Sequence, residues 1–153
     1  MTKEQTCCVT GHRDIPADKI EFVRESLRQE ILAAIGEGYT HFISGFAAGV
    51  DLIFAEIVAE LKDEYPITLE AAIPHPGRRY TSDAVFQALI KRCDTVKIHS
   101  DRYFKGSYII RNHNMVDQSA LVMAVYDGRR TGGTAATIKY ANETGRTARE
   151  IRL

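Results

Sequence analysis

Short apolar runs alternate along the chain with segments in which apolar residues recur every three or four positions. Short runs bounded by turn residues are typical of buried strands, and the wider spacing is typical of a helix that buries one face. The pattern predicts strands at about residues 6–10, 40–44, 67–73, 95–99 and 120–126, with residues 149–153 closing the sheet. It predicts helices at 16–36, after Gly45, after a cap at Ser82 or Asp83, and at about 107–118 and 134–143.

Strands that alternate with helices indicate parallel pairing through right-handed crossovers. The run at 120–126 is almost entirely apolar, as expected of a central strand covered on both faces, so it should be the best-buried strand. In the helix after Ser82 and Asp83, we expect Val85, Phe86, Leu89 and Ile90 to face inward. The prediction is one α/β domain over residues 1–153: a Rossmann-like, doubly wound, mainly parallel sheet of about five to six strands with helices on both faces.

Charge and composition narrow the choice of partners. Twenty lysines and arginines balance twenty acidic residues, so no global positive field draws the chain to nucleic acid, and nucleic-acid binding is not expected. The start of the chain lacks signal-peptide features, and no apolar stretch approaches the about 20 residues of a membrane span. We therefore expect a cytoplasmic protein without membrane contact. The three cysteines and five histidines lack metal spacing, so no metal is expected and the thiols should be reduced and buried.

Two loops that follow predicted strands are rich in glycine. Gly45 with Gly49, and Gly132 with Gly133, come directly before predicted helices. Ligands of doubly wound sheets bind at this edge, where glycines let backbone approach and the free N–H groups of helix starts attract anions. Both loops are therefore candidate phosphate sites, and the alternative is that the glycines only serve tight turns.

Arginines and other polar residues fill the same loops. Arginines offer the paired donors that phosphate oxygens prefer, or else they only solvate the surface. His12 is a candidate donor to phosphate or satisfies its own turn, Asp51 orients a ribose hydroxyl or caps its helix, and Asp127 faces the crevice or fixes the next turn. The candidate binding residues are Thr10, Gly11, His12, Arg13, Gly45, Gly49, Asp51, Arg78, Arg111, Asn112, Gly128, Gly132, Gly133 and Thr134, with Arg129 and Arg130 as further donors.

Four segments together resemble one known superfamily. VTGHR at 9–13, SGFAAGVD at 44–51, RNHNMVDQSALVMAVYDG at 111–128 and TGGT at 131–134 resemble the SLOG superfamily, and within it the YpsA-like branch. The superfamily includes the Smf/DprA DNA-processing proteins and the LOG-type nucleotide phosphoribohydrolases. The resemblance covers nearly the whole chain and implies a Rossmann-like fold that binds nucleotides or their derivatives. P-loop, dinucleotide-fingerprint and nucleophile-elbow motifs are absent.

The resemblance also assigns candidate catalytic residues. Arg111 stands where LOG-type enzymes carry a catalytic arginine, and Asp127 is the second candidate. Those enzymes carry a catalytic glutamate after the paired glycines, whereas here no carboxylate follows Gly133 until Glu143. The departure favours binding or sensing of a nucleotide-derived phosphate ligand and leaves open whether the chain is an enzyme. The alternative is N-glycosidic hydrolysis of nucleoside monophosphates, with Arg111 on the phosphate and Asp127 or Glu143 acting at the sugar or on water.

The expected partner is thus a nucleotide-derived small molecule, and no cofactor is required. Tyr80, Tyr103, Phe104 and Tyr108 are expected to be exposed, where they face a protein partner or cover the ligand. We expect a homo-oligomer on the same ground. Single-stranded DNA binding, by analogy with the DNA-processing proteins, is a third hypothesis that the zero net charge disfavours.

Overall fold

Six parallel strands form one sheet in the computed structural model, which describes residues 2–153. The strands are β1 (Thr6–Gly11), β2 (His41–Ser44), β3 (Thr68–Ile73), β4 (Thr95–Ile98), β5 (Leu121–Tyr126) and β6 (Thr147–Arg152). Their order is β4-β3-β2-β1-β5-β6, and every neighbouring pair is parallel. The predicted α/β class and Rossmann-like parallel sheet are confirmed. The sheet grows away from β1 in both directions, so the strand order reverses between β1 and β5.

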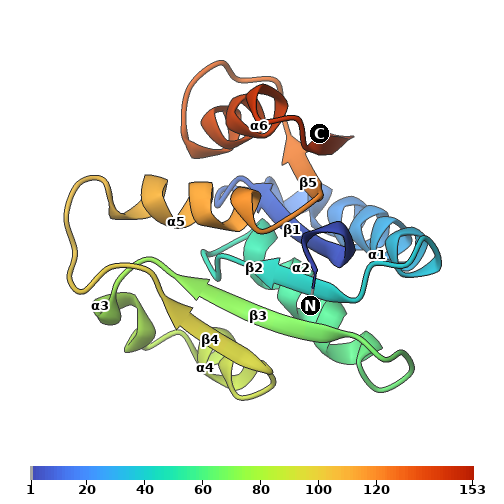
Figure 1. The fold of residues 1–153 in the computed structure, drawn as a ribbon, viewed down its shortest axis with the longest axis horizontal. Helices are drawn as coiled ribbons and strands as arrows, with labels where there is room; N and C mark the ends of the chain where they lie inside the picture. The colour runs from blue at the N-terminus through green and yellow to red at the C-terminus, as the bar shows by residue number, and fades with distance from the viewer. Residues whose placement is uncertain (1) are drawn as a thin grey trace.

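Helices cover both faces of this sheet (Figure 1). They are α1 (Ile20–Gly36), α2 (Val50–Leu61), α3 (Pro76–Arg79), α4 (Ala84–Ile90), α5 (Ser107–Asp117) and α6 (Gly133–Glu143), with 3-10 turns at Lys3–Gln5 and Ala17–Lys19. The helices α1, α2 and α4 enclose the larger apolar core on one face, and α5 and α6 form a smaller core on the other. Cys7 and Cys8 belong to opposite cores, as the alternation of side chains along a strand requires.

Burial follows position in the sheet. The strands β1, β2 and β5 are buried along nearly their whole length, because helices cover them on both faces. The helix α2 lies against β1, β2 and β3 and also contacts α1 and α4, which explains why most of its side chains are buried. Its Phe54 packs beside Phe42 of β2, with ring centroids 6.2 Å apart. Burial of one such side chain is worth about 1.5–3 kcal/mol.

Helix boundaries show where the sequence pattern was incomplete. The helix expected from residue 16 begins at Ile20, because Pro16 is extended and a 3-10 turn follows it. Of the two possible caps of α4, Asp83 is the one that accepts backbone hydrogen bonds. The prediction that Val85 faces inward is wrong, since its side chain is 51% exposed: a seven-residue helix has one buried stripe, and Phe86 and Ile90 occupy it. The helix α3 was not predicted, because a single turn is too short to show a helical period.

Candidate functional site

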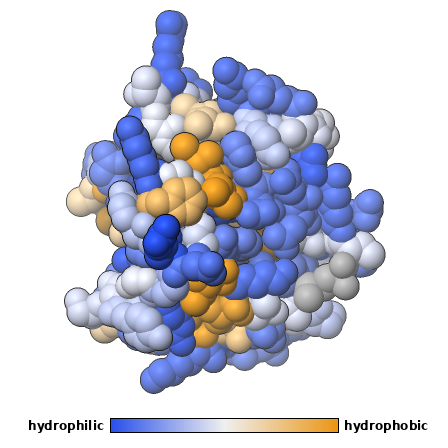
Figure 2. All heavy atoms as spheres, turned by 60° about the vertical axis from the view of Figure 1, so that its left-hand side comes forward, coloured by the Kyte–Doolittle hydropathy of each residue, from blue (hydrophilic) through white to orange (hydrophobic). Residues whose placement is uncertain are grey.

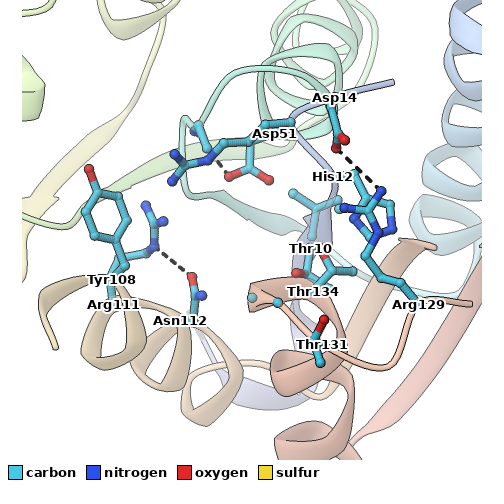
Figure 3. Close-up of a pocket in the computed structure, with 16 residues that line it drawn as sticks. Thr10, His12, Asp14, Asp51, Tyr108, Arg111, Asn112, Arg129, Thr131 and Thr134 are labelled. Carbon is cyan, nitrogen blue, oxygen red and sulfur yellow. Dashed lines mark hydrogen bonds and ion pairs between the residues drawn. The ribbon is translucent and has the colours of Figure 1, made fainter. Parts of the chain in front are cut away.

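A crevice of about 390 Å³ opens where the strand order reverses, beyond the carboxyl ends of β1 and β5 (Figure 3). Open parallel sheets bind their ligands at this point, and the volume lies within the about 300–1,000 Å³ common for small-molecule sites. The residues that line the crevice are Val9, Thr10, Gly11, His12, Arg13, Asp14, Ala47, Asp51, Tyr108, Arg111, Asn112, Arg129, Thr131, Gly132, Gly133 and Thr134.

The start of α6 forms one wall of the crevice. Gly132 precedes the helix with φ 98°, a left-handed conformation that glycine adopts without steric cost. Gly133 and Thr134 follow on the first turn, and no residue in the described range 2–153 accepts a hydrogen bond from their N–H groups. The first backbone bond into this helix runs from Ala136 N–H to Gly132 O, 3.1 Å long. The crevice therefore has unused donors and the positive end of a helix dipole on one side.

Arg111 of α5 also lines the crevice and is 3% exposed. Its Nη1 donates to the carbonyl oxygens of Gly45 (2.6 Å) and Ala72 (3.0 Å), and its Nε donates to Asn112 Oδ1 (2.8 Å). Burial lowers its pKa, and the charge of Asp51 opposes that change. This arginine ties α5 to the loop after β2 and to β3, so much of its donor capacity is already used inside the protein.

The loop after β2 holds Asp51 in the crevice. The Asp51 Oδ2 accepts from Ala47 N–H (3.2 Å), and Ser44 Oγ donates to the Asp51 carbonyl (2.8 Å). Burial raises the pKa of this carboxyl, while the Arg111 charge lowers it. Phe46 in the same loop has φ 56°, which costs a non-glycine residue about 1–3 kcal/mol. Its buried ring contacts Phe86, and its carbonyl accepts from Arg78 (2.9 Å).

The glycines of this loop serve packing. A Cβ on Gly45 would lie 2.8 Å from Arg111 Nη1 and from Asp51 Oδ2, and one on Gly49 would lie 2.6 Å from the carbonyl oxygen of His12. Gly49 also has φ 81°. Both positions therefore need glycine so that the loop can approach Arg111 and the end of β1, and neither lines the crevice.

An ion-pair cluster closes the outer rim of the crevice. Arg129 donates through Nη2 (2.6 Å) and Nε (3.0 Å) to Asp127, and its Nη2 lies 3.6 Å from Asp14 Oδ1. Hydrogen bonds from Arg129 hold the pKa of the Asp127 carboxyl well below its usual range. His12 Nε2 accepts from Asp127 N–H (3.2 Å). The cluster joins the loop after β1 to the loop after β5, across the reversal point.

Most residues predicted from the sequence meet in this crevice, but not all. Gly45, Gly49, Arg78, Gly128 and Asp127 lie outside its lining. The prediction missed Asp14, and it expected Arg129 only as a further donor. It placed Tyr108 among the aromatic residues that face a partner or cover the ligand.

The structure corrects the expected exposure of Tyr108, and the spacing of Tyr108 from Arg111 could have placed it at the crevice. It is half-buried rather than exposed, with Arg13 and Arg111 5.3 and 5.5 Å from its ring centroid. Tyr108 precedes Arg111 by three residues on α5, and this spacing puts two side chains on one helix face. Tyr80, Tyr103 and Phe104 are exposed, as predicted.

Comparison with known proteins identifies the family of this chain. The YpsA model, described as the YspA SLOG family, matches residues 7–152. The chain belongs to the YspA SLOG family. It is 30% identical over 141 residues to a UPF0398 protein of Ligilactobacillus salivarius (strain UCC118), covering 82% of this chain and 76% of the relative. A UPF0398 protein of Bacillus thuringiensis (strain Al Hakam) is 24% identical over 134 residues, covering 82% and 72%. The predicted superfamily and branch are confirmed.

Solved structures also match the fold of this chain. DNA processing protein A of Helicobacter pylori, whose structure is described for its single-stranded DNA binding mode, matches with a TM-score of 0.68 at 16% identity. The match covers 97% of this chain and 65% of that protein. A second structure, TM1055, matches with a TM-score of 0.61 at 16% identity, covering 94% of this chain and 72% of that one. At this identity both structures show the fold alone.

Exposed apolar side chains are the surface feature that concerns the predicted homo-oligomer. Figure 2 shows apolar patches separated by polar surface, on the side that contains the connection from β4 to α5. The exposed apolar side chains of β4 and α5 are Val96, Ile98, Ile109 and Ile110. The homo-oligomer stays a prediction. Among residues 2–153, no helix is long and apolar enough to cross a membrane.

Proposed function

We propose that the protein binds or senses a nucleotide, or a nucleotide-derived phosphate ligand, in the crevice between β1 and β5. The observation that carries the proposal is the start of α6: Gly133 and Thr134 line the crevice of about 390 Å³, and their N–H groups have no acceptor among residues 2–153. A helix start with unused donors binds anions without further side chains. The family membership of the chain supports the same class of ligand.

The rest of the crevice fits the non-phosphate part of such a ligand. Asp51 and Asp14 offer carboxylate oxygens, which accept from the hydroxyl groups of a sugar. Tyr108 offers an aromatic ring, and rings of this kind stack on nucleobases. The crevice thus offers N–H donors for a phosphate near α6, and carboxylate and aromatic groups for a nucleoside elsewhere in its lining.

A thermal-shift screen with native mass spectrometry tests the proposal. The probes are nucleoside mono-, di- and triphosphates, nucleotide sugars, ADP-ribose and NAD. A ligand present at a hundredfold excess over its Kd stabilises the folded chain by about 2.7 kcal/mol. We expect one ligand class to stabilise the wild type, and Gly132→Asp to abolish this effect by placing a negative charge at the anion site.

The chain offers a matched control at Gly38. Gly132 and Gly38 have φ of 98° and 102°, and a Cβ at either position meets nothing within 4 Å. Gly38→Asp therefore places the same charge at another positive-φ position, away from the crevice. Equal ligand binding by the two variants, or the absence of any bound nucleotide in the wild type, would overturn the proposal.

Hydrolysis of a nucleoside monophosphate is the second candidate function. A carboxyl whose pKa is raised by burial lines the crevice at Asp51, and such a group can serve as an acid or base. Glu143 ends α6, at the far end from Gly133, and does not line the crevice. Release of free base from nucleoside monophosphates, lost in Asp51→Asn, would support hydrolysis. If no base is released at high protein concentration, hydrolysis is ruled out and ligand binding remains the proposed function.

A further inference from the structure

A second cavity lies at the opposite edge of the sheet, near the strand starts. It measures about 420 Å³, far more than the about 30 Å³ of one water molecule. Its lining includes His41, the first residue of β2, and Glu70 and Lys97 from β3 and β4. We call it the strand-start cavity. It shares no lining residue with the crevice.

Two buried ionisable side chains form its floor. His41 and Glu70 are 3% and 2% exposed. Both ring nitrogens of His41 are engaged, Nδ1 with Thr68 Oγ1 (2.6 Å) and Nε2 with Glu70 Oε1 (2.9 Å). The histidine is therefore fixed on both sides, and one oxygen of the carboxylate is fixed with it.

The other carboxylate oxygen has no partner. Glu70 Oε2 is buried and makes no hydrogen bond within the described residues. An unsatisfied buried polar group destabilises the fold, and more so when it is charged. A ligand that donates to Glu70 Oε2 would remove this destabilisation, so the cavity favours a ligand that carries an N–H or O–H donor.

The surrounding charges restrict what that donor can be. Lys97 Nζ lies 3.7 Å from Glu70 Oε1 and 3.4 Å from Gln118 Oε1, and Lys3 also lines the cavity. A ligand with only a positive charge would be repelled by the two ammonium groups. A metal ion lacks ligands here, because no group of three or more candidate metal-ligating side chains occurs in residues 2–153.

We propose that the strand-start cavity binds a small zwitterion of the α-amino acid class. Its ammonium group donates to Glu70 Oε2, and its carboxylate lies against the ammonium groups of Lys97 and Lys3. The pairing satisfies the orphaned oxygen and brings a carboxylate to both lysines. The site is separate from the nucleotide crevice, so the two proposals stand or fall independently.

Calorimetric titration of the full chain tests the class of ligand. Each proteinogenic amino acid is titrated to about 10 mM, well above a Kd of about 1 mM, alongside methylammonium and acetate as half-ligands. We expect at least one amino acid to bind and neither half-ligand to do so. Binding of methylammonium alone, or of no amino acid, would overturn the proposal.

Two variants locate the binding. Glu70→Gln keeps the size of the side chain and removes its charge, and Lys97→Gln removes the charge of a half-exposed lysine. Each should weaken amino acid binding at least about tenfold. Lys91→Gln, at an exposed lysine outside the cavity, is the control and should bind as the wild type does. Unchanged binding in both folded cavity variants would place the amino acid elsewhere and refute the site.

Discussion

Gly11 ends β1 directly against the first residue of α2. A Cβ on Gly11 would lie 2.4–2.6 Å from side-chain atoms of Val50, and Val50 is fully buried. A β-branched side chain enclosed in this way has no alternative rotamer to adopt. The absence of a side chain at Gly11 therefore lets α2 begin at the floor of the crevice.

We predict that Gly11→Ala lowers the free energy of unfolding by about 1–3 kcal/mol, because it overpacks this contact. Urea unfolding measures the loss. The double variant Gly11→Ala with Val50→Ala should lose less than the sum of the two single variants, since the smaller side chain makes room. Strict additivity would show that the contact does not cause the destabilisation.

Asp51 should make stability depend on pH in the direction opposite to most carboxylates. Burial raises its pKa above the ordinary value of 3.8. Between the unfolded and folded pKa values the folded chain binds more protons, so this group lowers stability as pH rises through that window. We predict that Asp51→Asn becomes more stable relative to the wild type from about pH 3 upward through the window, and that the difference is constant above it. Denaturant titrations at successive pH values measure the difference, and one that is flat or falls with pH would contradict this account.

The short helix α4 depends on its N-terminal cap. Asp83 Oδ1 accepts from the N–H groups of Val85 (2.9 Å) and Phe86 (3.2 Å). A helix of seven residues is too short to be stable alone, so the cap and the burial of Phe86 together hold it on the core.

We predict that Asp83→Ala costs about 1 kcal/mol of unfolding free energy, as the loss of a capping carboxylate does. Ser82→Ala is the control, because Ser82 is exposed and the neighbouring Asp83 makes the capping bonds. Guanidinium unfolding of the two variants measures the difference. An equal loss in both would assign the effect to the loop and not to the cap.

At the scale of the whole molecule, the balance of charges predicts weak binding to nucleic acid. The formal net charge is zero, and Arg111 and Arg129 already donate to carbonyl and carboxylate oxygens inside the protein. We predict that single-stranded DNA binds no tighter than about 10⁻⁴ M at physiological salt. Fluorescence anisotropy with a labelled oligonucleotide measures this. Tight binding that weakens steeply with added salt would instead point to the function described for the Helicobacter pylori protein of similar fold.

The sequence by itself determined the elements and their class. Alternating apolar runs and helical spacings marked all six strands and five of the six α-helices, because burial on a sheet or on one helix face imposes periods that are local along the chain. Loop position likewise predicted part of the crevice lining: His12, Gly132 and Thr134 follow strands whose carboxyl ends share one edge. The sequence did not predict the single turn α3 or the exposed position of Val85, because neither produces a repeating pattern of apolar residues.

Only the tertiary structure decided what each polar residue touches. Arg111 meets the carbonyl oxygens of Gly45 and Ala72, which are 66 and 39 residues away along the chain. His41 meets Glu70 because β2 and β3 are neighbours in register. Such contacts depend on strand order and helix placement, which the packing of the whole core fixes. The sequence therefore determined where the crevice lies, and tertiary packing decided which donors and acceptors along it remain free.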